Sequence, residues 1–178
     1  MIIVIPNILT TARLVLVPIF AYLVLGAQNL TAAAIVLILS GITDIVDGYI
    51  ARRFHMVSNF GKVYDPFVDK LMQITAVVCL ALAEIIPTWI IAVVLSKEIA
   101  MIVIGGILYL KKIVVYSNWY GKVATVIFYT IIFILILWRN ISSAWTIGLL
   151  SILVVTMLGA AILYLVDIIK HYEIKRVD

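Results

Sequence analysis

Four aspartates stand in otherwise apolar sequence, and they are the residues best suited to chemistry: Asp44, Asp47, Asp65 and Asp69. An ionised aspartate at the centre of a membrane helix costs roughly 2.5 to 3.5 kcal/mol even on lenient insertion scales, so four of them need compensating cations. Hard divalent cations prefer oxygen ligands, and two of them cancel the formal charge of four carboxylates. Two such ions about 3.5 to 4 Å apart can bind phosphate oxygens during displacement at phosphorus. The sequence therefore predicts a two-metal site for phosphoryl chemistry.

Helical spacing gathers these aspartates on two faces, together with small residues and one arginine. The first face carries Asp44, Asp47, Gly48, Ala51 and Arg52, and the second carries Gly61, Asp65 and Asp69. Residues three, four, seven and eight apart share one side of a helix. Because the connection from 53 to 60 is short, we expect the two helices to be antiparallel neighbours whose carboxylates meet at one level. The small residues leave room for a ligand, and the arginine offers a cationic fork for a phosphate.

The composition is that of an integral membrane protein. Of the 178 residues, 66% are hydrophobic and only 12% are charged, whereas about a quarter are charged in a soluble domain. Apolar stretches of about 20 residues indicate six transmembrane helices, at roughly 7–26, 31–53, 61–85, 88–110, 119–138 and 143–169. With no linker or low-complexity segment between them, we expect an all-α protein with one domain, residues 1–178, formed by a single six-helix bundle.

The basic residues predict the orientation of this bundle. They cluster at both sides of the 53–62 connection, at 111–112 and at 170–176, while the opposite side carries only Arg139. By the positive-inside rule, both termini face the cytoplasm. The ionisable residues within the spans then lie mostly in the cytoplasmic half, so we expect a polar cavity open to the cytoplasm. Lys97 and Glu98 are the deepest pair, and their opposite charges allow mutual neutralisation.

The same charges could also have a structural or a transport role. Asp44 and Asp47 could be structural acids satisfied by Ser40, Thr43 or arginines, although four aspartates at fixed spacing favour metal binding. Lys97 and Glu98 could be no more than a buried ion pair. Intramembrane acids also mark cation carriers, which form a different class of protein. A carrier needs a polar route through both membrane halves, and the outer halves hold no ionisable residue except Glu84, so an enzyme is the favoured hypothesis.

The pattern Asp-x2-Asp-Gly-x2-Ala-Arg-x8-Gly-x3-Asp-x3-Asp, complete from Asp44 to Asp69, resembles the CDP-alcohol phosphatidyltransferase family. The resemblance extends over essentially the whole chain and includes the stretch 6–13, Pro66, Lys70 and Gly121-Lys122. It implies transfer of the phosphatidyl group of CDP-diacylglycerol to an alcohol, with release of CMP. It also implies a homodimer surrounded by membrane lipids, and we expect a bacterial cytoplasmic membrane with the active site facing the cytoplasm and no nucleic-acid partner.

The same resemblance assigns roles to individual residues. It implies that the four aspartates bind two divalent cations, Mg²⁺ or Mn²⁺, and that Asp69 is also the general base. The residues that it places around the CDP-lipid are Asn7, Thr10, Asp44, Gly48, Ala51, Arg52, Gly61 and Asp65.

The acceptor alcohol has two candidates. The start Asn7-Ile8-Leu9-Thr10 and the pair Asp65-Pro66 are similar to phosphatidylglycerophosphate synthases, whose acceptor is sn-glycerol 3-phosphate. That branch usually carries arginines in its fourth span, and this chain does not. Its Ser96-Lys97-Glu98 also resembles the cardiolipin synthases of the family, whose acceptor is phosphatidylglycerol. A phosphate-bearing acceptor needs cations, and the candidates here are Arg13, Lys70, Lys97 and Lys122.

Overall fold

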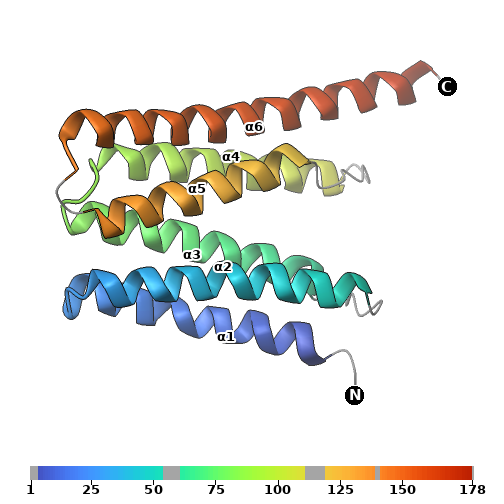
Figure 1. The fold of residues 1–178 in the computed structure, drawn as a ribbon. Helices are drawn as coiled ribbons and strands as arrows, with labels where there is room; N and C mark the ends of the chain where they lie inside the picture. The colour runs from blue at the N-terminus through green and yellow to red at the C-terminus, as the bar shows by residue number, and fades with distance from the viewer. Residues whose placement is uncertain (1–3, 54–60, 111–118, 139–140, 178) are drawn as a thin grey trace. The chain divides into compact units, whose positions relative to one another are not determined.

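The computed structural model describes residues 4–53, 61–110, 119–138 and 141–177, and all their regular elements are helices (Figure 1). Side chains at 4–8, 45, 47–53, 61–63, 66, 105–110 and 168–177 lie outside this description. The elements are α1 (Val4–Ala21), a short π-helix η1 (Tyr22–Gly26), α2 (Leu30–Arg53), α3 (Gly61–Leu82), α4 (Trp89–Leu110), α5 (Trp119–Leu137) and α6 (Ser143–Val177). The predicted all-α class is confirmed.

Helix ends follow local hydrogen bonding more closely than hydropathy. Asn29 caps α2, because its side-chain oxygen accepts a bond from the backbone N–H of Ala32 at 3.0 Å. Helix α3 ends at Leu82, three residues before the predicted limit, where Glu84 adopts a left-handed φ of 57°. Helix α6 continues to Val177, eight residues past the predicted end at 169. Hydropathy marks the apolar part of a helix, whereas backbone capping decides where the helix stops.

Three helices are long and apolar enough to cross a membrane within the described ranges: Leu9–Gly26, Trp119–Leu137 and Ser143–Asp167. Helix α2 adds a shorter apolar stretch, Leu30–Asp44. Large apolar side chains such as Val15, Ile102 and Val155 are exposed, as lipid contact requires. The chain is therefore a membrane protein, and the count of six spans stays a prediction.

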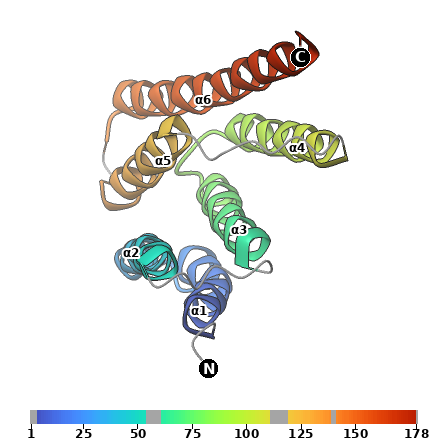
Figure 2. The same ribbon diagram turned by 90° about the vertical axis from the view of Figure 1, so that its right-hand side faces the viewer.

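The chain divides into two compact units. The first comprises Met1–Ile91 with Ile132–Arg139, and the second comprises Ala92–Ile131 with Asn140–Asp178. In the first unit α1 packs against both α2 and α3 (Figure 2). Each of these three helices carries buried side chains, among them Phe20 on α1, Leu37 on α2 and Met72 on α3.

This packing corrects the expectation that α2 and α3 are direct neighbours. Among the residues with described placement, the extensive contacts of both helices are with α1, and contacts between α2 and α3 themselves are at most slight. A short connection brings the ends of two helices together, but it does not force their lengths into contact. Helix α1 is consequently the element that positions the two motif-bearing helices.

In the second unit, a hydrogen bond joins α5 to α6. The Tyr120 hydroxyl donates to Asp167 Oδ2 at 2.7 Å. Buried apolar side chains come from both helices, including Phe128, Leu150 and Leu153.

Tryptophans lie exposed at helix ends, where an aromatic belt at the membrane interface is expected: Trp89, Trp119, Trp138 and Trp145.

Candidate active site

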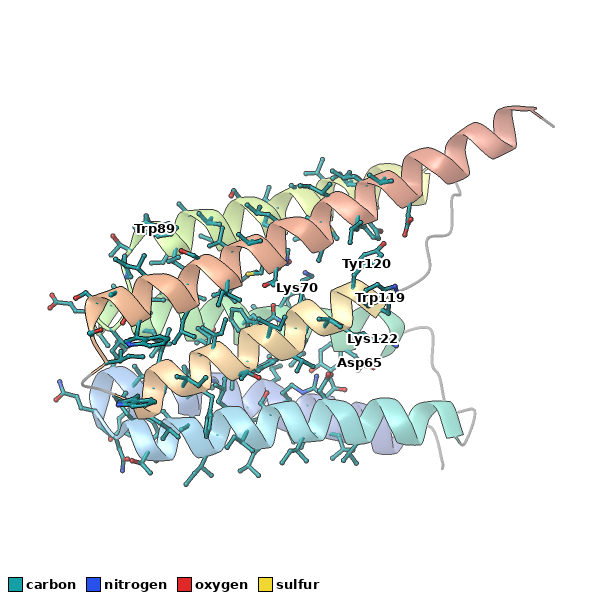
Figure 3. All side chains as sticks on the ribbon, turned by 45° about the horizontal axis from the view of Figure 1, so that its top comes forward. Asp65, Lys70, Trp89, Trp119, Tyr120 and Lys122 are labelled. Carbon is teal, nitrogen blue, oxygen red and sulfur yellow. The ribbon has the colours of Figure 1, made fainter. Side chains whose placement is uncertain are left out.

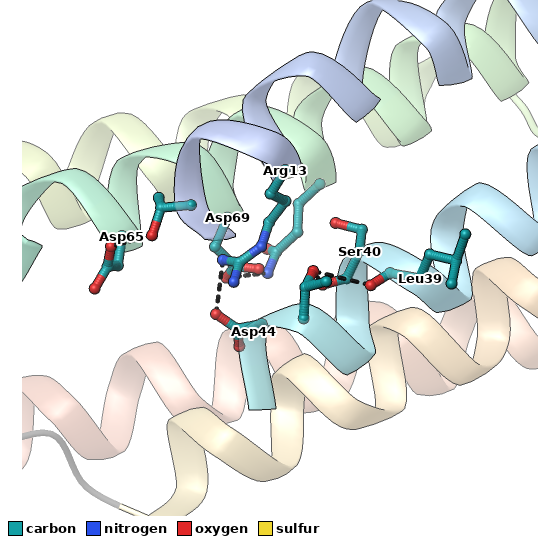
Figure 4. Close-up of polar contacts among 9 residues, drawn as sticks. Arg13, Leu39, Ser40, Asp44, Asp65 and Asp69 are labelled. Atoms are coloured by element: carbon teal, nitrogen blue, oxygen red, sulfur yellow. Dashed lines mark hydrogen bonds and ion pairs between the residues drawn. The ribbon is translucent and has the colours of Figure 1, made fainter. Parts of the chain in front are cut away.

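Two side chains of α1 each form a hydrogen bond with a motif aspartate, one on α3 and the other on α2. Thr10 and Arg13 are one helical turn apart, and neither is accessible to solvent. The Thr10 hydroxyl donates to Asp65 Oδ1 of α3 at 2.6 Å. Arg13 Nη1 donates to Asp44 Oδ1 of α2 at 2.7 Å (Figure 4). Motif aspartates of α2 and α3 are therefore connected through α1, although they lie 21 positions apart in the sequence.

The ion pair between Arg13 and Asp44 is asymmetric in burial. The Arg13 side chain is 0% exposed, and the Asp44 side chain is 41% exposed. Arginine cannot be deprotonated in a protein, so a fully buried guanidinium needs an anionic partner. Asp44 supplies it while keeping part of its carboxylate accessible. Asp44 thus pairs with an arginine, which is one of the structural alternatives to metal binding that the sequence left open.

Asp69 is held from its own helix. Gln73, one turn later on α3 and 6% exposed, donates from Nε2 to Asp69 Oδ2 at 3.0 Å. Sequence reasoning missed Gln73, although a polar residue four positions after Asp69 in an apolar run could have identified it. The amide restrains the carboxylate that the family resemblance identifies as the general base.

Ser40 and Thr43 do not satisfy Asp44. Thr43 donates to backbone oxygens of its own helix, those of Leu39 at 2.9 Å and Ser40 at 2.8 Å. Ser40 is fully buried one turn before Asp44, and its Oγ has no hydrogen-bond partner within the described structure. An orphaned hydroxyl of this kind calls for an explanation such as a water molecule or a ligand atom. Ser40 is thus a second residue that the sequence did not assign to the site.

Several predicted site residues have side chains outside the described part of the structure. The backbone of each lies in α1, α2 or α3: Asn7, Asp47, Gly48, Ala51, Arg52 and Gly61. Their roles stay predictions.

The candidate acceptor cations differ in accessibility. Arg13 is buried against Asp44, and Lys70 is half-buried on α3. Lys97 donates to Glu98, which confirms their mutual neutralisation. Lys122 is exposed near the start of α5, two residues after Tyr120 (Figure 3). Lys97 and Lys122 belong to the second unit. Lys122 is therefore the candidate whose charge is most available to a ligand.

The donor chemistry of the site fits a hard divalent cation. Asp44, Asp65 and Asp69 all offer carboxylate oxygens, the ligand type that Mg²⁺ and Mn²⁺ prefer. No group of three histidine, cysteine or acidic residues lies close enough to hold a metal ion in the portion of the chain that is described, a portion that omits the Asp47 side chain. Convergence of the full quartet on metal ions stays a prediction.

We expect Thr10→Val to lower the free energy of unfolding by about 1–2 kcal/mol, because it leaves Asp65 without a buried hydrogen-bond donor. Thr10→Ser keeps the hydroxyl and serves as the matched control. Unfolding in detergent micelles measures both variants. Equal stability of Thr10→Val and the unmodified protein would contradict the structural role of this bond.

Comparison with known proteins places the chain in a family. The model of the CDP-alcohol phosphatidyltransferase family matches residues 3–166. A "Cardiolipin synthase (CMP-forming)" of Streptomyces coelicolor is 42% identical over 109 residues, 58% of this chain and 51% of that protein.

A second relative is matched over more of its length. The "CDP-diacylglycerol--glycerol-3-phosphate 3-phosphatidyltransferase" of Bacillus subtilis is 36% identical over 134 residues, 67% of this chain and 69% of that protein. The match thus spans about half of the Streptomyces protein and about two thirds of the Bacillus protein. Since the family model covers nearly the whole sequence, the chain belongs to the CDP-alcohol phosphatidyltransferase family.

Proposed function

We propose that this protein is an integral membrane phosphatidyltransferase of phospholipid biosynthesis. It transfers the phosphatidyl group of CDP-diacylglycerol to sn-glycerol 3-phosphate and releases CMP. The observation that carries this proposal is the complete aspartate motif on α2 and α3, two of whose carboxylates are held by Thr10 and Arg13 of α1. The name of the Bacillus relative supports the acceptor, and its match covers more of that relative than the Streptomyces match does.

Members of this family generally depend on divalent cations. The proposed ligands are Asp44, Asp47, Asp65 and Asp69, which would bind two ions, either Mg²⁺ or Mn²⁺. When bound, such ions neutralise negative charge on phosphate oxygens and orient them for displacement. The accessible part of the Asp44 carboxylate and the orphaned Ser40 hydroxyl nearby support a ligand at this position.

The protein side chains would perform the proton transfer and hold the nucleotide. Asp69 takes the proton of the acceptor hydroxyl, and Gln73 keeps its carboxylate oriented. The acceptor oxygen then forms a bond to the lipid phosphorus, while the bond from that phosphorus to the CMP oxygen breaks. No covalent bond to the enzyme is required. The residues proposed around the CDP-lipid are Asn7, Thr10, Asp44, Gly48, Ala51, Arg52, Gly61 and Asp65.

The proposed setting is a bacterial cytoplasmic membrane. Six helices would span it, with both termini and a polar cavity on the cytoplasmic side, and the protein would form a homodimer. The distribution of basic residues supports this orientation. The exposed apolar side chains of the described helices supply surfaces for the acyl chains of the lipid substrate.

A second acceptor, phosphatidylglycerol, is favoured by a specific observation. The Streptomyces relative is named as a cardiolipin synthase and has 42% identity over its matched region. With that acceptor the same displacement would form cardiolipin. The two reactions share the donor, the leaving group and the proposed base, so the acceptor-binding residues must distinguish them.

We expect purified protein to release CMP from CDP-diacylglycerol only when Mg²⁺ or Mn²⁺ and an acceptor are present. Mass spectrometry of reactions with sn-glycerol 3-phosphate or phosphatidylglycerol identifies the product. Phosphatidylglycerophosphate supports the main proposal, and cardiolipin supports the second. Absence of CMP with every acceptor, in protein shown to be folded, would refute the enzymatic function and favour a carrier.

Asp69→Asn should lower the turnover number by at least about 100-fold, because general base catalysis typically contributes that much. Binding of CDP-diacylglycerol should largely persist, since three of the proposed metal ligands remain. Glu84→Gln removes an exposed acid beyond the far end of α3 and is the control. Equal losses of lipid binding and turnover would exclude Asp69 as the base.

Lys122→Gln tests the most accessible acceptor cation. We expect a rise of about tenfold in the KM for sn-glycerol 3-phosphate with little change in the KM for CDP-diacylglycerol, because charge-assisted hydrogen bonds contribute about 1.5–3 kcal/mol. Lys62→Gln, which removes one of the basic residues beside the 53–62 connection, is the control. Similar changes in both KM values would remove Lys122 from the acceptor site.

A further inference from the structure

We propose that Arg13 is a built-in counter-ion of Asp44. Its charge stabilises the acidic site when no metal ion is bound and lowers the affinity of that site for a divalent cation. This inference rests on the proposed function, since it concerns the same carboxylates. It replaces the acceptor-binding role that the sequence left open for Arg13. The residue's burial, its partner and its fixed charge each support the inference.

Burial separates Arg13 from the ligand. Its side chain is 0% exposed, so an acceptor that arrives from water cannot reach the guanidinium while α1 keeps its place. Asp44, by contrast, is 41% exposed, so a ligand can reach the carboxylate but not its buried partner. The 2.7 Å bond occupies Oδ1 of Asp44. A residue placed behind a carboxylate in this way acts on the ligand only through that carboxylate.

The positive charge of Arg13 determines the direction of its effect on protein stability and on metal binding. The four motif aspartates carry a formal charge of −4, and Arg13 offsets the charge of Asp44 without any metal ion. Like charges that share one site repel, and this repulsion destabilises the folded protein unless a cation offsets it. Arginine keeps its charge at every relevant pH, so its contribution is permanent. Without Arg13, the metal-free protein should be less stable and should gain more from a bound dication.

The stabilisation that a bound dication gives to the folded protein can be measured without an activity assay, because ligand binding and folding are thermodynamically linked. A ligand that binds only the folded state stabilises it in proportion to the logarithm of its concentration divided by its dissociation constant. Loss of a nearby positive charge strengthens dication binding, so the rise in melting temperature on adding metal should increase. A residue that only filled space would lower the melting temperature with and without metal by the same amount.

The test compares Arg13→Gln with Arg13→Lys in detergent micelles, in EDTA and in saturating Mn²⁺. Glutamine keeps a hydrogen-bond donor but removes the charge, and lysine keeps the charge. Cys79 is the single cysteine and is buried, so a thiol-reactive dye reports unfolding. We expect Arg13→Gln to lower the melting temperature in EDTA by about 5 °C or more and to show a Mn²⁺-induced rise about twice that of the unmodified protein or larger. Arg13→Lys should restore the unmodified Mn²⁺ response.

Tyr120→Phe is the matched control. It removes a hydrogen bond of the same 2.7 Å length that joins two helices of the second unit and involves no motif aspartate. It should lower the melting temperature equally in EDTA and in Mn²⁺. If Arg13→Gln behaves like Tyr120→Phe, Arg13 has a structural role only, and the inference is wrong. A selective rise in the acceptor KM with an unchanged Mn²⁺ response would overturn it as well.

A double-mutant cycle separates this inference from the proposed function. In EDTA, Arg13→Gln combined with Asp44→Asn should lower the melting temperature by clearly less than the sum of the single changes, because each removes the same ion pair. Additive losses would refute the counter-ion role even in an active enzyme. Absence of both a Mn²⁺ response and CMP release in the unmodified protein would instead refute the proposed function, and the EDTA cycle would still decide the role of Arg13.

Discussion

The cost of charge in apolar surroundings is the constraint on which this structure depends. A carboxylate or guanidinium removed from water loses several kcal/mol of solvation unless a partner compensates it. The first unit meets this requirement through α1, whose Arg13 and Thr10 reach Asp44 and Asp65 on different helices. Helix α1 therefore does more than supply a candidate membrane span, because its polar side chains fix the level at which α2 and α3 present their acids.

The second unit satisfies the same requirement in two other ways. Lys97 and Glu98 are adjacent in sequence and compensate each other within α4. Asp167 lies near the end of an apolar stretch of α6 and accepts a hydrogen bond from Tyr120 of α5. The ion pair within α4 is a local interaction, whereas the hydrogen bond between α5 and α6 is a tertiary one. Among the four candidate acceptor cations, Lys122, two residues after Tyr120, is the exposed one.

Around the proposed reaction centre, neutral donors orient two of the acids, and Arg13 pairs with a third, Asp44. Thr10 and Gln73 each fix one carboxylate oxygen without adding charge. Arg13 adds a positive charge. Such an arrangement orients the acids for a divalent cation or a substrate hydroxyl. Ser40, one helical turn before Asp44, is buried and its hydroxyl has no partner in the described structure.

The sequence by itself determined the helical class, the membrane character, the helix positions apart from the C-terminal end of α6, and the family, because hydropathy, motif spacing and side-chain type are local properties of the chain. It also identified Lys97 and Glu98 as a pair, since neighbours in sequence are neighbours in space. Only the tertiary structure decided that α1 packs against both motif helices, that Asp44 pairs with Arg13 and that Asp65 pairs with Thr10. These contacts join residues 31 and 55 positions apart, and helical periodicity gives the face of each helix but not which helix that face meets.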